Sequence, residues 1–247
     1  MKIKHVARGL AVAIATLTAL MATESVSKAF TVPTSDQYSS QLNGKLGLGY
    51  DTWLKFNGYI NREAQFLSDA ELSPLNLDDL TWATGVNDVE VFFVNEGAEY
   101  HNKILFSADN RNTTTTIFED ASSSNSIFPN GGPLALGQGV NLGGFAGRTS
   151  LSFLLQNPNG NIYGANTAQN IDGTQHITAY KSDGYLVLGF EDLDWGGDRD
   201  YNDVVIAVRG MVDAEENSAD VPEPFSGAAL LVLGMVSWVG LRRQKKA

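Results

Sequence analysis

The chain has 247 residues, no cysteine and a formal net charge of −11 at pH 7. This length suits one large β domain or two small ones. The absence of cysteine excludes a disulfide framework, thiolate catalysis and a zinc–thiolate site. The acidic balance disfavours nucleic acid and anionic lipid as partners, whereas it suits metal cations.

Residues 1–29 have the pattern of a secretory signal peptide. Three basic residues come first, at Lys2, Lys4 and Arg8. Residues 9–22 then form an apolar stretch that is too short to span a bilayer comfortably. Ser27-Lys28-Ala29 fits the small residues of a cleavage site. We therefore expect export and cleavage by signal peptidase, and an N-terminal membrane anchor is the alternative.

Residues 30–85 form the N-terminal part of the expected ectodomain. Residues 30–40 are polar and contain proline, which predicts a mobile lead-in. Apolar and aromatic residues recur from residue 46 to 66, with a spacing that fits a helix or a strand equally well. The sequence leaves the structure of this segment open.

Residues 86–212 contain short β-branched and apolar runs separated by turn residues. The predicted strands are 88–95, 100–107, 113–118, 150–155, 175–180, 185–190 and 204–208. We expect the first two to pair with each other, and the glycine-rich run 137–144 to be a turn. The pattern predicts an all-β domain, an antiparallel β-sandwich that is jelly-roll-like.

An acidic loop joins the last two predicted strands. Six of its residues carry carboxylates: Glu191, Asp192, Asp194, Asp198, Asp200 and Asp203. Only Arg199 opposes them, and like charges repel one another strongly in a compact loop. Because the flanking strands are apolar, the loop cannot simply extend into water. A hard cation such as calcium, which takes six to eight oxygen ligands, would neutralise it.

The spacing within the loop supports such a site. Asp198, Asp200 and Asn202 form a D-x-D-x-N run, which can direct alternate oxygens at one ion. The run departs from the EF-hand loop, because Asp203 replaces the glycine and Arg209 replaces the last glutamate. We therefore expect a site on a β-loop, with Glu191 or Asp192 as the bidentate ligand.

A loop without metal is the alternative. Asp and Asn side chains can accept hydrogen bonds from nearby backbone N–H groups and so hold a turn themselves. Gly196-Gly197 would supply the positions with positive φ.

The acidic loop and its flanks carry a resemblance to a known family. The string GFEDL…GGDRDYNDVVIAV, from residue 189 to 208, is similar to the signature of the bacterial family called domain of unknown function 4114. Residues 89–96 and 137–143 fit its looser pattern, so the resemblance covers roughly residues 86–210. It implies a secreted or surface-attached bacterial protein, often with a sorting signal. The acidic residues of the family have prompted suggestions of enzymatic activity.

The C-terminus has three parts after an acidic linker at residues 213–220. The motif Val221-Pro222-Glu223-Pro224 comes first, and an uncharged segment at residues 225–241 predicts a transmembrane helix. Four basic residues follow: Arg242, Arg243, Lys245 and Lys246. They are expected to remain cytoplasmic.

Residues 221–247 together resemble the PEP-CTERM sorting signal of bacteria that make extracellular polysaccharide. The resemblance implies processing by exosortase, a membrane transpeptidase, after transient anchoring in the inner membrane. The destination would be the cell surface, outer envelope or extracellular matrix. An ordinary tail anchor is the alternative.

Other chemistry has weaker support in the sequence. Trp53, Trp82 and Trp195 could stack on sugars, and Trp195 is the candidate for a polysaccharide-binding site. Paired carboxylates could hydrolyse glycosides. No G-x-S-x-G, H-E-x-x-H or Walker motif occurs. His101 and His176 are expected to be surface or half-buried residues.

We therefore expect an exported protein of structural or adhesive role, with calcium as a stabilising ion and no enzymatic activity. The alternatives are a module that binds exopolysaccharide and a carboxylate-dependent hydrolase.

Overall fold

The computed structural model of the protein describes residues 30–60, 73–74, 82–85, 87–129 and 131–213. The predicted signal peptide, most of the acidic linker and the predicted sorting signal lie outside these residues. Within the described part, no helix has the length and apolar character needed to cross a membrane.

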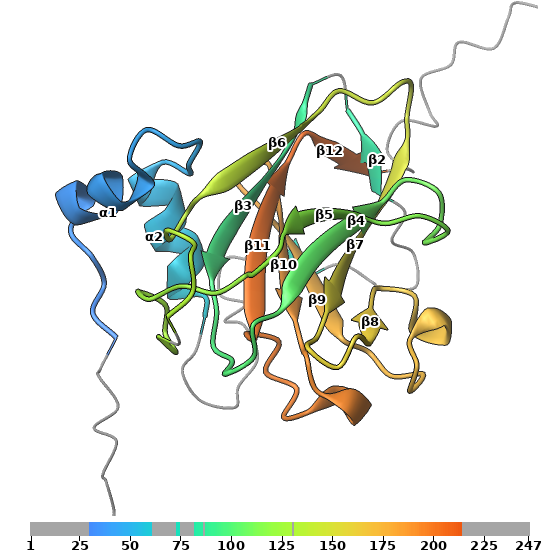
Figure 1. The fold of residues 1–247 in the computed structure, drawn as a ribbon. Helices are drawn as coiled ribbons and strands as arrows, with labels where there is room; N and C mark the ends of the chain where they lie inside the picture. The colour runs from blue at the N-terminus through green and yellow to red at the C-terminus, as the bar shows by residue number, and fades with distance from the viewer. Residues whose placement is uncertain (1–29, 61–72, 75–81, 86, 130, 214–247) are drawn as a thin grey trace, which may run out of the picture.

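Two antiparallel sheets make up most of the fold (Figure 1). The first has the order β1 (Ser73–Pro74), β9 (Ile177–Ser182), β10 (Tyr185–Phe190), β11 (Val204–Arg209), β3 (Val89–Asn95) and β6 (Gly139–Gly143). The second has the order β12 (Met211–Asp213), β2 (Trp82–Thr84), β7 (Ser150–Gln156), β4 (Lys103–Ser107) and β5 (Thr115–Phe118), and β8 (Ile162–Tyr163) pairs with β7. The prediction of a mainly antiparallel β fold is confirmed, whereas the jelly-roll-like connectivity stays a prediction.

The first sheet is covered on both faces. On one face, Phe93 of β3 packs edge-on against Phe118 of β5, with ring centroids 6.5 Å apart. The neighbouring Phe92 points to the other face, where Tyr185 lies between it and Phe56 of helix α2 (Tyr50–Gly58). Strands covered in this way become continuously apolar, and β11 has five consecutive buried residues. One hydrophobic core therefore joins both sheets in a sandwich-like packing.

The N-terminal segment corrects the prediction of a mobile lead-in. Helix α1 (Ser35–Leu42) begins with a capping box, in which Thr34 Oγ1 accepts from Gln37 N and Gln37 Oε1 accepts from Thr34 N. Tyr38 is buried, and its hydroxyl donates to the Leu48 carbonyl at 3.0 Å. A short polar helix is thus held by its cap and one aromatic anchor.

The segment after residue 46, for which the sequence fits a helix or a strand equally well, contains helix α2. Trp53 is fully buried, and its indole N–H donates to the Val94 carbonyl of β3 at 2.9 Å. Figure 1 shows α1 and α2 together at the side of the first sheet, next to β3 and β6. The remainder of the segment, from residue 61 to 66, lies outside the described residues.

Two predictions are wrong, one about the pairing of a strand and one about a turn. β4 does not pair with β3, because the chain crosses to the second sheet between them and places β4 between β7 and β5. The glycine-rich run 137–144 contains strand β6, which pairs with β3. A side chain at Gly139 would collide with the ring of Phe92, so glycine is what lets β6 approach its partner.

Candidate metal centre

The β10–β11 hairpin fixes both ends of the acidic loop. Phe190 and Val204 are the last paired residues, and Asp203 N donates to the Phe190 carbonyl at 3.1 Å. Glu191 N donates to the His176 carbonyl at 2.9 Å, which ties the start of the loop to the segment before β9. The carboxylates that directly follow β10 and precede β11 are therefore forced into proximity.

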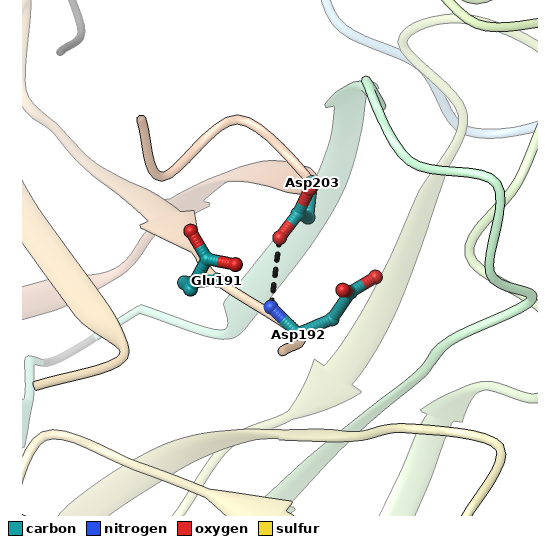
Figure 2. A group of neighbouring side chains, drawn as sticks. All are labelled: Glu191, Asp192 and Asp203. Atoms are coloured by element: carbon teal, nitrogen blue, oxygen red, sulfur yellow. Dashed lines mark hydrogen bonds between the residues drawn. The ribbon is translucent and has the colours of Figure 1, made fainter. Parts of the chain in front are cut away.

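An inner group of three carboxylates lies at this junction. One oxygen from each of Glu191, Asp192 and Asp203 lies within 4.8 Å of the others. Asp192 N donates to Asp203 Oδ2 at 2.7 Å, as Figure 2 shows. Glu191 and Asp192 are only 1% and 2% exposed, so water screens these charges poorly.

A second group shares Glu191 with the first. Glu191, Asp198 and Asp200 also bring one oxygen each within 4.8 Å of one another. Asp198 is exposed and Asp200 is buried, so this group leads from the interior to the surface. Five of the six predicted carboxylate ligands thus fall in two groups joined by Glu191.

The other two predicted ligands have different surroundings. Asp194 belongs to neither group; its Oδ1 accepts from Asn161 Nδ2 at 3.0 Å and from the Tyr163 hydroxyl. Asn202 is buried beside Asp200, and its Nδ2 donates to Asp200 Oδ2 at 2.6 Å. Its amide nitrogen therefore faces the second group, and its amide oxygen lies beside Gly97.

The pKa values of the buried carboxyls are raised. Burial raises the pKa of Asp203 far above its usual range, and the charges of Asp192 and Glu191 raise it further. Burial likewise raises the pKa of Glu191 and Asp192, and Asp198 adds to both shifts. The pKa of Asp200 rises to about 6, mainly through burial. Ionising the cluster is therefore costly unless a cation neutralises it.

The loop follows an unusual path around these groups. Gly196 and Gly197 have φ values of 78° and 39°, as the sequence predicts. Trp195, Arg199 and Tyr201 also have positive φ, at 67°, 62° and 54°, which is uncommon for residues with a side chain. A side chain at Gly197 would collide with Glu191 Oε1, so glycine is needed where the loop passes the carboxylate.

Part of the loop holds itself, as the metal-free alternative predicts. Asp200 Oδ1 accepts from Asn202 N at 3.1 Å, which forms an Asx-turn. Glu191 Oε2 accepts from Arg199 N at 3.0 Å. These bonds occupy some oxygen lone pairs but add no positive side chain. Lys103 and Arg209 form ion pairs with Glu119 and Glu90, which belong to neither carboxylate group.

His176 is a functional candidate that the sequence did not reveal. The prediction of a surface or half-buried residue is wrong, because His176 is fully buried. Its Nδ1 lies 2.9 Å from the Glu191 carbonyl and its Nε2 lies 2.9 Å from Asp172 Oδ2. The Thr174 hydroxyl also contacts Nε2, at 3.0 Å, so both ring nitrogens have hydrogen-bond partners. The D-x-x-x-H spacing from Asp172 was the available signal.

Asp172 and Tyr163 complete the support for His176. Burial opposes ionisation of Asp172, but hydrogen bonds from Thr174 N, His176 and Trp195 N outweigh it and lower its pKa. The ring of Tyr163 stacks on the ring of His176, with the two centroids 3.8 Å apart. His176 is thus held close to the cluster, where it partly offsets the rise in the pKa of Asp192 that burial causes.

The tryptophans divide into different roles. Trp53 is in the core, which corrects its candidacy for sugar stacking. The Trp82 side chain lies outside the described residues. Trp195 is 72% exposed, and its backbone N–H donates to Asp172 Oδ2 at 2.5 Å. Its side chain therefore lies largely in solvent, on the acidic loop.

Comparison with known proteins finds a match to one family. No curated protein and no solved structure matches the chain. The upstream segments 89–96 and 137–143 lie outside the family match, which is narrower than the sequence resemblance suggested. The match includes β7 to β11 and the entire acidic loop. Residues 145–211 of this chain are thus similar to the family described as Domain of unknown function (DUF4114).

Proposed function

We propose that this protein is an exported component of the cell surface or extracellular matrix, with a structural or adhesive role and a calcium-stabilised β-sandwich. One observation supports calcium above the others. Glu191, Asp192 and Asp200 are each at most 5% exposed, and with Asp198 and Asp203 they form two groups that share Glu191 at the end of the β10–β11 hairpin. Such a concentration of buried like charge favours binding of a compact cation.

The donor atoms favour calcium over other metals. The two groups offer carboxylate oxygens, with the Asn202 amide close by, and oxygen ligands suit hard cations. His176 already uses both ring nitrogens in hydrogen bonds. The irregular loop suits the flexible coordination of calcium better than the strict octahedron of magnesium. With the loop between two core strands, the ion would stabilise the fold.

Carbohydrate binding is a second candidate, because Trp195 is 72% exposed in a backbone conformation that is uncommon for tryptophan. A flat indole face in solvent can stack on a pyranose ring. A carboxylate-dependent hydrolase is the remaining alternative, and no further observation favours it.

Export and sorting are proposed from the two ends of the chain. The basic, apolar and small-residue pattern of residues 1–29 supports cleavage by signal peptidase. The Val221–Pro224 motif, the uncharged segment and the basic tail support recognition by an exosortase-type transpeptidase. The membrane would then be a transient partner through residues 225–241.

The first prediction concerns the melting temperature in EDTA and in calcium. With free calcium about tenfold above the dissociation constant, linkage gives about 1.4 kcal/mol, or a rise of roughly 3–5 °C. Magnesium should raise the melting temperature less. Identical wild-type curves in EDTA and calcium would contradict a calcium site.

Asp198→Asn separates a metal site from a self-held turn more sharply than a change at Asp200, which also forms the Asx-turn. Asp198 is exposed, and its charge raises the pKa of neighbouring buried carboxyls. The substitution should therefore leave the melting temperature in EDTA unchanged or slightly higher, and should reduce the rise caused by calcium. Asp51→Asn, an exposed change on α2, is the matched control and should keep the full calcium response.

The second prediction tests carbohydrate binding with Trp195→Ala. If the exposed indole stacks on sugars, wild-type protein should be retained on a column of exopolysaccharide and the variant should elute early. The calcium-dependent rise in melting temperature should persist in the variant, because the indole is not a metal ligand. Equal elution of the two proteins would remove this second candidate.

The third prediction concerns processing. Mass spectrometry of the protein from its native host should find a new N-terminus near Phe30 and loss of the segment after the Val221–Pro224 motif. An intact chain from Met1 to Ala247 in the cytoplasm would contradict export and sorting.

A further inference from the structure

Two buried side chains next to the inner carboxylate group each keep an oxygen without a hydrogen-bond partner. These atoms are Glu96 Oε2 and Asn102 Oδ1, and both residues are fully buried. They lie in the connection from β3 to β4, which the sequence did not associate with the acidic loop. Buried oxygens are rarely left unpaired, so each needs an explanation.

Glu96 is held in one orientation. Its Oε1 accepts from Ser126 Oγ at 2.8 Å and from Ser123 N at 3.3 Å, so Oε2 is the oxygen that remains. Burial raises the pKa of Glu96 to about 8, and the charges of Asp120 and Asp192 raise it further. The next residue, Gly97, donates from its N–H to the Asn202 carbonyl at 2.9 Å, and Asn95 pairs with Val205 of β11, so Glu96 lies beside the acidic loop at the end of the first sheet.

Asn102 contacts the inner group directly. Its Nδ2 lies 2.6 Å from Asp192 Oδ2, and its Oδ1 is unpaired. A half-turn of the amide exchanges the positions of its oxygen and nitrogen with little change in shape. The amide oxygen would then face the Asp192 carboxylate, an arrangement that is favourable only when the two oxygens move apart from the present 2.6 Å and coordinate one cation, at roughly 2.3–2.6 Å from each.

We propose an inner cation site formed by Glu96 Oε2, Asn102 Oδ1 and the Asp192 carboxylate, for a hard divalent cation such as calcium. It rests on the proposed calcium-binding function and adds a second ion to the outer group of Glu191, Asp198 and Asp200. Two carboxylates balance the charge of the ion, and all donors are oxygen atoms.

The inner ion joins the two sheets. Glu96 follows β3 and Asp192 follows β10, both of the first sheet, whereas Asn102 precedes β4 of the second sheet. Asn157, which follows β7 of the second sheet, donates to the Asp192 carbonyl at 3.1 Å and holds the same junction. The site thus closes one end of the sandwich with ligands from both layers.

The experiment counts calcium ions bound per full chain by equilibrium dialysis against radioactive calcium. Wild type should bind two ions and Glu96→Gln one, because glutamine keeps an oxygen for Ser126 but removes the charge. Asp198→Asn should lose the outer ion and keep the inner one. Glu99→Gln, an exposed change on the same connection, should still bind two.

Melting curves in EDTA confirm that each variant is folded. If Glu96→Gln does not fold, Asp192→Asn replaces it, and it should also lose the inner ion. Equal ion counts for wild type and for the folded inner-site variant would overturn the inner site and leave the outer site intact. No bound calcium in wild type would overturn both proposals.

Discussion

The main physical constraint on this structure is that its core hairpin buries several carboxyl groups away from water. β10 and β11 are core strands, and their last pair, Phe190 and Val204, leaves little freedom to the residues that follow. Glu191, Asp192 and Asp203 are attached at that point, so the burial of the strands also buries their charges. Removing a charge from water is costly unless a proton or an opposite charge compensates. Protons provide the compensation when no cation is bound, which is why the pKa values of these groups rise.

The centre is built by loops from both sheets. His176 binds the Glu191 carbonyl from the segment before β9, and Asn102 and Asn157 reach Asp192 from the second sheet. Each of these partners holds the backbone or the side chain of a carboxylate residue in place. The geometry therefore depends on the packing of the two layers, and a bound ion would in turn strengthen that packing. Structural stabilisation and the proposed ion binding would thus depend on the same arrangement.

Local sequence patterns predicted the hairpin and its acidic loop because the strands, the glycines and the carboxylates are close in sequence. The same patterns failed where contacts span distant segments. The sequences of β3 and β4 look like a hairpin, yet the chain crosses between the sheets, and this crossing brings Asn102 to Asp192. Helix α1 escaped prediction because its stability comes from a cap and one buried tyrosine.

The central claim is that a divalent cation replaces protons on the buried carboxyls. Calorimetric titration with calcium at pH 7, in buffers of different ionisation enthalpy, tests it most directly. Because burial raises the pKa of Glu191 and Asp203, calcium should release about one proton or more per chain, and the observed enthalpy should vary with the buffer. Affinity should rise with pH for the same reason. Binding heat that does not depend on the buffer, or no binding heat at all, would contradict the account.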